Sequence, residues 1–196
     1  MSKHFITADK LLADAFQLTR NIVDSGFQPT ALLALWRGGT PIGIGIHEGL
    51  SYLGIQAKHF ALRTSYYDDN NQRKDTVQID QIGTFAAQFT NHERLLIVDD
   101  VFDSGNTLKA VIKHIQNDDS IITPAQIKIA TPYFKPKQNQ TDFYPDFYLH
   151  ETDDWIVFPH ELMGLSAEEI KQNKPNATVL LDLPNLPKPS KQTEKA

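Results

Sequence analysis

Cysteine is absent from this chain of 196 residues, and its absence excludes several kinds of protein. Without a thiol there is no disulfide framework, no thiolate zinc site and no cysteine nucleophile. Long apolar runs are missing as well. The N-terminal MSKHFITADKLL lacks the hydrophobic region of a signal peptide, and no stretch approaches the roughly 20 apolar residues of a membrane span. We therefore expect a protein of the reducing cytoplasm that has no membrane partner.

Positive charge is also scarce, because 19 Lys and Arg stand against 24 Asp and Glu, for a formal net charge of −5. A broad nucleic-acid surface needs clustered cations, so no nucleic-acid partner is expected. A small anionic substrate remains possible, since backbone N–H groups can hold a phosphate on an acidic protein. The chain has neither the HExxH spacing of a zinc hydrolase nor the GxxxxGK loop of a kinase.

The length and the alternation of helix and strand patterns predict a single α/β domain over residues 1–183, with a mostly parallel central sheet flanked by helices. Residues 184–196 are rich in Pro and Lys and are expected to be disordered. The expected elements are a helix over 11–23, a strand over 31–36, a helix N-capped by Thr40, a strand over 55–62, a long loop over 63–75, a strand over 95–98, a helix over 107–115, a strand over 126–130 and a short helix begun by a capping box of Ser166 and Glu169.

The string LLIVDDVFDSGNT, residues 95–107, carries the most chemistry. Its two adjacent carboxylates, Asp99 and Asp100, follow a buried strand, where open α/β sheets place their ligands. The loop that follows leads into a helix, so its backbone N–H groups can wrap a phosphate with the help of the helix dipole. The alternative is that the two acids are solvated loop residues, as other Asp pairs of this chain can be.

This string closely resembles the signature of type I phosphoribosyltransferases for 5-phosphoribosyl 1-pyrophosphate (PRPP). The resemblance implies the fold of that family, including a small hood made from the N- and C-terminal segments. It also implies that Asp99 and Asp100 bind the ribose hydroxyls and position Mg²⁺. The segment that follows them would cradle the 5-phosphate with Ser104, Gly105, Asn106 and Thr107, and Asp103 before it is counted among the PRPP-binding residues as well.

Three further segments, in the order that the family requires, resemble its xanthine-guanine branch. The first, Trp36-Arg37-Gly38-Gly39, is similar to the pyrophosphate loop, in which a non-proline cis peptide turns backbone amides toward the leaving group. By itself it could also be an ordinary glycine turn. The nearby GIGIHEG, residues 43–49, does not fit a dinucleotide-binding loop, because its third glycine comes one residue late.

The second segment, residues 65–73, resembles the loop that closes over PRPP and excludes water from the reacting sugar. The resemblance makes Ser65, Tyr66 and Arg73 candidate ligands of the phosphates. Without it, the same stretch is a polar connection whose arginine is solvated.

The third segment resembles a purine pocket. Lys135 could donate to the oxygen at purine C6, Trp155 could stack on the base, and the backbone of Ile156 could read the ring edge. The alternatives are a surface lysine and a core tryptophan. The family often has an aromatic residue where this chain has His160, so the far wall of the pocket departs from the pattern.

Together these resemblances imply a Mg²⁺-dependent purine phosphoribosyltransferase of purine salvage, with PRPP and a 6-oxopurine as substrates and a homo-oligomeric state of two or four subunits. Arg37 would neutralise the departing pyrophosphate, and Asp103 would handle a proton at N7 of the base. Two alternatives stay open. One is a PRPP-binding regulator with little turnover, and the other is transfer to a pyrimidine or an amine.

Overall fold

The computed structural model of this chain describes residues 3–67, 73–79, 85–87 and 89–183. These residues form two compact units, a smaller one from Met1–Ala8 and Asp154–Ala196 and a larger one from Asp9–Asp153. Each unit is described by itself. The expected domain limits at residues 1–183 stay a prediction, and the expected disorder of residues 184–196 lies outside the described residues.

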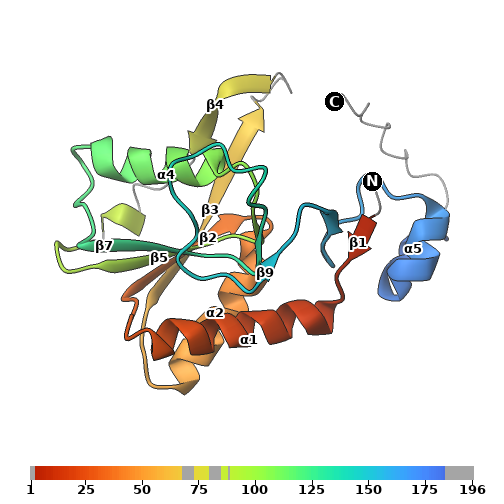
Figure 1. The fold of residues 1–196 in the computed structure, drawn as a ribbon, viewed down its shortest axis with the longest axis horizontal. Coiled ribbons are helices and arrows are strands. Elements are labelled where there is room, and N and C mark those ends of the chain that lie inside the picture. Colours follow the sequence, from red (N-terminus) through yellow and green to blue (C-terminus); the bar gives the residue numbers. More distant parts are fainter. Residues whose placement is uncertain (1–2, 68–72, 80–84, 88, 184–196) are drawn as a thin grey trace. The chain divides into compact units, whose positions relative to one another are not determined.

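A five-stranded sheet forms the centre of the larger unit (Figure 1). Its four neighbouring strands β3, β2, β5 and β7 are parallel, and β4 joins the edge strand β3 in antiparallel pairing. The predicted α/β class with a mostly parallel sheet is therefore confirmed. In sheet order the strands are β4 (Arg73–Ile79), β3 (Lys58–Tyr67), β2 (Ala31–Trp36), β5 (Arg94–Val98) and β7 (Gln126–Ala130).

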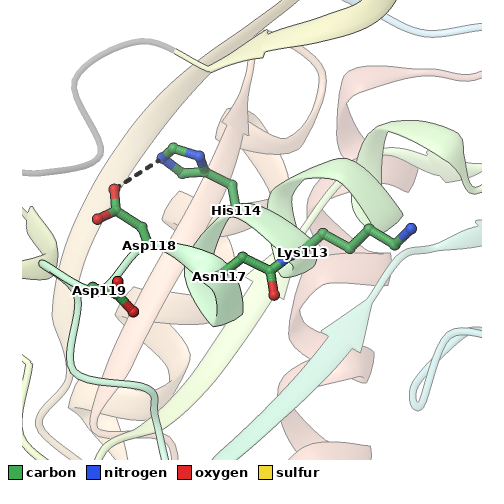
Figure 2. Close-up of a pocket in the computed structure, with 5 residues that line it drawn as sticks. All are labelled: Lys113, His114, Asn117, Asp118 and Asp119. Atoms are coloured by element: carbon green, nitrogen blue, oxygen red, sulfur yellow. Dashed lines mark ion pairs between the residues drawn. The ribbon is translucent and has the colours of Figure 1, made fainter.

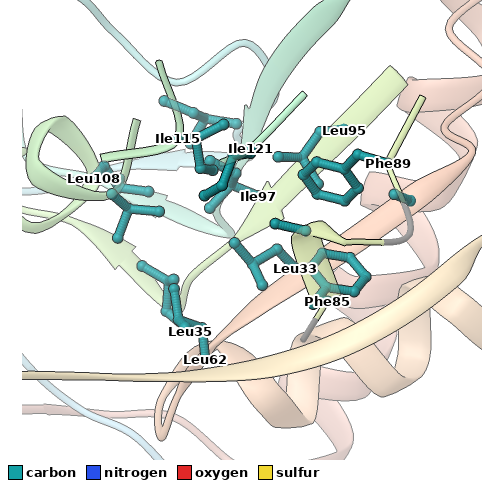
Figure 3. Close-up of a cluster of buried hydrophobic side chains, with 14 of the residues drawn as sticks. Leu33, Leu35, Leu62, Phe85, Phe89, Leu95, Ile97, Leu108, Ile115 and Ile121 are labelled. Atoms are coloured by element: carbon teal, nitrogen blue, oxygen red, sulfur yellow. The ribbon is translucent and has the colours of Figure 1, made fainter. Parts of the chain in front are cut away.

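Helices cover both faces of this sheet. In Figure 1, α1 (Ala8–Asp24) and α2 (Gly39–Tyr52) lie on one side, and α4 (Asn106–Asn117) lies on the other. Successive residues of a strand point to opposite faces, and β2, with five of its six residues buried, supplies both. The α4 face holds a cluster of buried apolar side chains, which Figure 3 shows around Leu33, Leu35, Leu62, Phe85, Leu95, Ile97, Leu108 and Ile115.

The other face depends on the glycines of GIGIHEG. A Cβ atom added to Gly43 would lie 2.8 Å from the Cβ of Ala34 in β2, and one added to Gly45 would lie 2.7 Å from the Cβ of Ala15 in α1. Both distances are too short for real atoms, so only glycine lets α2 approach the sheet and α1 this closely. These glycines therefore serve helix packing, which agrees with the rejection of a dinucleotide-binding loop.

A second, three-stranded sheet in the order β6-β8-β9 lies in the larger unit. Its strands are parallel, and they comprise β6 (Val101–Phe102), β8 (Tyr133–Phe134) and β9 (His150–Glu151). Strand β6 follows the acid pair directly, and β8 precedes Lys135. Pairing of β6 with β8 therefore brings two predicted site segments together that are 32 residues apart in the sequence.

The smaller unit is built from both ends of the chain, as expected for the hood. Strand β1 (Lys3–Phe5) pairs in parallel with β10 (Trp155–Val157). Helix α5 (Ala167–Asn173) begins with the predicted capping box of Ser166 and Glu169, and the 3₁₀ helix η1 (Pro175–Leu180) follows it. An ion pair of 2.8 Å joins Lys3 Nζ to Glu169 Oε1, so the capping residue also ties α5 to β1.

Two local predictions were wrong. Thr40 is not an N-cap, because α2 already begins at Gly39 and the hydroxyl of Thr40 donates to the carbonyl oxygen of Arg37 at 2.6 Å. The described residues of the expected long loop over 63–75 are strand, since β3 continues to Tyr67 and β4 begins at Arg73. Pairing along the edge of a sheet does not require an apolar pattern, which is why periodicity missed this hairpin.

Candidate functional site

Parallel pairing of β2 with β5 carries two predicted segments to the same edge of the sheet. Ala34 pairs with Val98, so the loop after Trp36 and the acid pair after Val98 emerge side by side. A Cβ atom on Gly38 would overlap the carboxylate of Asp100, and one on Gly39 would overlap the carbonyl oxygen of Val98. The two glycines are thus needed for the close approach of these loops.

The pyrophosphate-loop prediction included a non-proline cis peptide, and the structure has one between Trp36 and Arg37. That part of the prediction is confirmed. The side chains of both residues are exposed at the carboxyl edge of the sheet. Arg37 is therefore accessible to an anionic ligand, while its assigned role with pyrophosphate stays a prediction.

The acid pair is held by backbone contacts. The N–H of Asp99 donates to the carbonyl oxygen of Ala130 at 3.2 Å, and the N–H of Asp100 donates to Oδ1 of Asp99 at 3.0 Å. Burial, together with the neighbouring charge of Asp100, raises the pKa of Asp99 well above its ordinary value. A bound cation would counter both effects, so the pair is suited to binding one.

In the described part of the chain, no cluster of three or more His, Asp or Glu side chains could hold a metal ion. Mg²⁺ is commonly held by one or two carboxylates, with the remaining oxygens supplied by water and substrate phosphates. Asp99 and Asp100 fit that mode of binding. The two acids do not form a closed metal site made of protein ligands alone.

The predicted 5-phosphate site, Ser104–Thr107, is called the phosphate loop below. It follows β6 and leads into the start of α4. Its Gly105 is the N-cap of the helix and has φ +76°, a conformation that favours glycine. A Cβ atom there would also lie 2.8 Å from the ring of Phe102, which is a second reason for glycine at this position. No side chain caps the start of α4. The N–H of Asn106 reaches the hydroxyl of Ser104 at 3.4 Å, which is a long contact. The first turn of the helix, from Asn106 to Leu108, therefore directs its backbone N–H groups and the positive end of the helix dipole at this loop, as anion sites do.

Lys135 joins this site, although it is distant in the sequence. Its backbone N–H donates to the carbonyl oxygen of Phe102 at 2.9 Å, and its Nζ lies 3.2 Å from Oδ2 of Asp103. The ammonium and the carboxylate that were assigned to the base thus lie beside one another. A surface lysine, which was the alternative, does not describe this residue, because only 14% of its side chain is exposed.

Trp155 and Ile156 belong to the smaller unit, where β10 pairs with β1 through Lys3 and His4. Ile156 is buried, so it can offer only its backbone to a ligand. His160 stacks on Phe158 with ring centroids 5.6 Å apart. The contribution of these residues to a base pocket stays a prediction.

Ser65, Tyr66 and Arg73 occupy strand positions in the β3–β4 hairpin, with Tyr67 paired to Arg73. The centre of the predicted closing loop, residues 68–72, lies outside the described residues. The assignment of these side chains to the phosphates therefore stays a prediction.

Two features were not expected from the sequence. Gln140 contacts the phosphate loop through both its backbone and its side chain. The polar run QNQT, residues 138–141, gave no signal beyond that of a surface loop. A pocket of roughly 590 Å³ also lies at the far end of α4, between Lys113 and Asp119. Figure 2 shows its ion pair, His114 Nε2 to Asp118 Oδ2 at 3.8 Å, and no predicted site residue lines it.

The fold and this site define an α/β protein whose candidate site lies at the carboxyl edge of a parallel sheet and offers groups suited to a phosphorylated ligand. This chain belongs to the phosphoribosyl transferase domain family, because a sequence model of that domain matches residues 6–163. The resemblance seen in the motifs is thereby confirmed. No curated protein sequence matches the chain.

Solved structures of purine phosphoribosyltransferases are similar to this chain. The enzyme of Pyrococcus horikoshii is 25% identical, with a TM-score of 0.64, and the match covers 85% of this chain and 98% of that one. The xanthine-guanine-hypoxanthine phosphoribosyltransferase of Helicobacter pylori is 23% identical, with a TM-score of 0.62 and coverage of 89% and 99%. The similarity at 23% identity shows that this chain and the Helicobacter pylori enzyme share a fold, and nothing more.

A protein of Neisseria gonorrhoeae that was crystallised with ppGpp has the same fold, with 19% identity, a TM-score of 0.70 and coverage of 90% of this chain and 97% of that one.

None of the helices that the structure describes is long and apolar enough to cross a membrane.

Proposed function

We propose that this protein transfers the phosphoribosyl group of PRPP to a 6-oxopurine base, which is hypoxanthine, guanine or xanthine, and releases pyrophosphate. One observation carries the proposal. The loop at Trp36–Gly39, the acid pair and the phosphate loop meet at one edge of the sheet, and Lys135 reaches that edge beside Asp103. Family membership supports the transferase class, and the purine enzymes with the same fold support the choice of base.

PRPP would lie across the carboxyl edge of the sheet. Its 5-phosphate would accept hydrogen bonds from the loop Ser104–Thr107, which leads into α4, and its ribose hydroxyls would face Asp99 and Asp100. Asp99 and Asp100 would hold Mg²⁺, which would supply positive charge against the departing pyrophosphate. The exposed guanidinium of Arg37 would add donors on the same side.

The bond changes involve few protein groups. The bond from the anomeric carbon to the pyrophosphate oxygen breaks, and a bond from that carbon to N9 of the base forms. The proton on N7 of the base then has to leave. Asp103 would accept it, because its carboxylate is half exposed at the edge where the base must lie. Most of the catalysis would therefore come from positioning and from charge neutralisation.

Base selection would rest on Lys135. An ammonium donates hydrogen bonds and cannot accept them, so it matches the oxygen at C6 of a 6-oxopurine and mismatches the amino group of adenine. The indole of Trp155 would stack on the base, and the backbone of Ile156 would read its edge, as the resemblance implies. This activity would place the protein in purine salvage.

A second candidate is a regulator that binds PRPP or a related nucleotide with little turnover. The observation in its favour is the Neisseria gonorrhoeae protein of the same fold, which was crystallised with ppGpp. Asp103 argues for the enzyme, because a protein that binds a nucleotide without turnover does not need a proton acceptor beside the base. Transfer to an amine would leave Lys135 without a base to contact.

We also propose that two copies of the chain associate through the face that α1 and α2 share. Leu12 and Phe16 of α1 and Tyr52 of α2 are exposed there, and Tyr52 is 91% exposed. Arg20 and Glu48 line the same groove, so a twofold axis can place Arg20 of each copy opposite Glu48 of the other copy. Light scattering should give a larger mass for the wild type than for Tyr52→Asp.

The test of the main proposal is nucleotide formation. Protein with PRPP, Mg²⁺ and each of hypoxanthine, guanine, xanthine, adenine and uracil is assayed by chromatography. We expect nucleoside monophosphates from the oxopurines and none in excess chelator. The double variant Asp99→Asn/Asp100→Asn should be inactive. The matched pair Asp118→Asn/Asp119→Asn, at the far end of α4, should keep its activity. Tight binding of PRPP without product from any base would favour the regulator instead.

A further inference from the structure

The segment after Lys135 returns to the phosphate loop and contacts it along its length. The N–H of Lys135 donates to the carbonyl oxygen of Phe102 at 2.9 Å, and the N–H of Gln140 donates to that of Ser104 at 3.0 Å. These two bonds flank Asp103 on both sides. The backbone on either side of the proposed proton acceptor is therefore fixed by one turn of chain.

The side chain of Gln140 adds a contact of its own. Its Oε1 accepts a hydrogen bond of 2.9 Å from Nδ2 of Asn106, the first residue of α4. The neighbouring Thr141 closes the space above the capping glycine, since its methyl group would lie 2.9 Å from a Cβ atom at Gly105. Gln140 thus forms two hydrogen bonds with the loop, one from its backbone to Ser104 and one from its side chain to Asn106.

The turn that presents Gln140 is itself held in place. Oδ1 of Asn139 accepts hydrogen bonds from the N–H of Thr141 at 2.8 Å and from its hydroxyl at 2.7 Å. Nδ2 of Asn139 donates to the carbonyl oxygen of Phe143 at 2.9 Å. The ring of Phe143 packs edge-on against Phe102 at 5.6 Å. These contacts anchor the turn in the core beneath the loop.

We infer that Gln140 is a positioning residue for the 5-phosphate of PRPP. The side chain of an asparagine can turn onto its own or a neighbouring backbone N–H group, and Asn106 directly follows the capping Gly105. The bond to Gln140 holds the Asn106 amide away from such a position, so this amide does not compete with the phosphate for the backbone N–H groups of the loop. This inference rests on the proposed function, since it concerns the same substrate.

A residue that acts only on this loop has a recognisable kinetic signature. Loss of the Gln140 amide should raise the Kd and the KM for PRPP by about fivefold to tenfold, the size of one lost hydrogen bond. The kcat at saturating PRPP and the KM for the base should stay within about twofold, because the loss falls on binding of one substrate alone. A general loss of folded protein would lower kcat instead.

The experiment compares Gln140→Met, which keeps the length of the side chain and removes its acceptor, with the matched control Gln138→Met on the same turn. Gln138 is exposed, and its backbone N–H, which bonds to Lys135, is unaffected by the substitution. Gln140→Met likewise keeps the backbone bond to Ser104, and thermal unfolding confirms that each variant is folded. PRPP binding is measured by calorimetry with Mg²⁺, and KM and kcat are measured by nucleotide formation.

A double-mutant cycle with Asn106→Ala identifies the contact responsible. Gln140→Met should weaken PRPP binding in the wild-type background and have no further effect when Asn106 is already alanine. An unchanged Kd for PRPP in Gln140→Met, or an equal loss in both backgrounds, would overturn the inference alone. Wild-type protein that binds neither PRPP nor a nucleoside 5′-monophosphate would overturn the proposed function, and this inference with it.

Discussion

Nζ of Lys135 lies 3.2 Å from Oδ2 of Asp103, although the two residues are separated by 32 positions in the sequence. The lysine side chain is 14% exposed and the carboxylate 50%, so the ammonium is the shielded partner. A shielded cation needs an acceptor at all times. Asp103 supplies one here, and in the proposed reaction the oxygen at C6 of the base would supply another.

Base discrimination should therefore depend on Lys135. Adenine offers an amino group to a cation that cannot accept a hydrogen bond, and a site built for a hydrogen-bonded substrate rejects such an analogue by about four powers of ten. Lys135→Ala should lower kcat/KM for hypoxanthine and guanine by about tenfold to a hundredfold and leave the low value for adenine unchanged. The measurement is kcat/KM for hypoxanthine, guanine, xanthine and adenine in both proteins.

Lys137→Ala is the matched control, because Lys137 lies on the same turn, is 81% exposed and pairs with Asp153. It should keep the discrimination of the wild type. Wild-type protein that used adenine as readily as hypoxanthine would show that Lys135 does not select the base.

Asp103 should act on the chemical step rather than on binding. Replacement by Asn keeps the shape of the side chain and removes its ability to accept a proton. A positioned general base typically contributes about a hundredfold to ten-thousandfold, so kcat of Asp103→Asn should fall by that amount while the KM for PRPP changes little. Asp142→Asn, an exposed carboxylate 3.6 Å from Lys109, is the control and should behave as the wild type. A normal kcat in Asp103→Asn would exclude it as the proton acceptor.

The two glycines of the Trp36–Gly39 loop should respond differently to alanine. At Gly38 the added methyl group meets the side chain of Asp100, which can turn aside. Gly38→Ala should therefore keep its stability and lose affinity for Mg²⁺ and PRPP. At Gly39 the methyl group meets the backbone carbonyl of Val98, which cannot move without disturbing β5. Gly39→Ala should lose about 1–3 kcal/mol of stability.

Urea unfolding and PRPP calorimetry on the two glycine variants separate these effects, and each variant is the control for the other. Equal losses of stability in both would contradict the distinction between a movable side chain and a fixed carbonyl.

Glu93 gives a prediction for the pH dependence of folding. Burial alone would raise its pKa, but hydrogen bonds from Lys58 at 2.7 Å and from Thr30, with the charge of Lys58, bring the pKa below the ordinary 4.5. A carboxylate with a lowered pKa contributes stability that is fully present above the unfolded pKa and is lost as the pH falls through the native one. Glu93→Gln should therefore lose about 1–2 kcal/mol at pH 7, a value that allows for the partial exposure of Lys58.

Urea unfolding of both proteins between pH 7 and pH 3 is the measurement. The difference in unfolding free energy should be constant down to pH about 4.5 and shrink below it. Glu168→Gln, on the exposed first turn of α5, should differ from the wild type by less than about 0.5 kcal/mol throughout. A difference that persists at low pH would mean that the amide disturbs packing rather than charge.

The sequence by itself determined the features that depend on neighbouring residues. The string at residues 95–107 predicted a strand, an acid pair, a phosphate loop and a helix, because each of these follows from the order of apolar residues, acids and glycine over one short stretch. The capping box of Ser166 and Glu169 was predicted for the same reason, since both of its hydrogen bonds close within four residues.

Only the tertiary structure decided which distant residues share a site. Parallel pairing of β2 with β5 sets the Trp36–Gly39 loop against Asp100, and pairing of β6 with β8 sets Lys135 beside Asp103. The hydrogen bond between Asn106 and Gln140 joins residues 34 positions apart, and the polar stretch around Gln140 has no periodicity. The pairing of strands and the contacts between distant loops depend on the path of the whole chain. Local propensity and residue spacing therefore do not predict them.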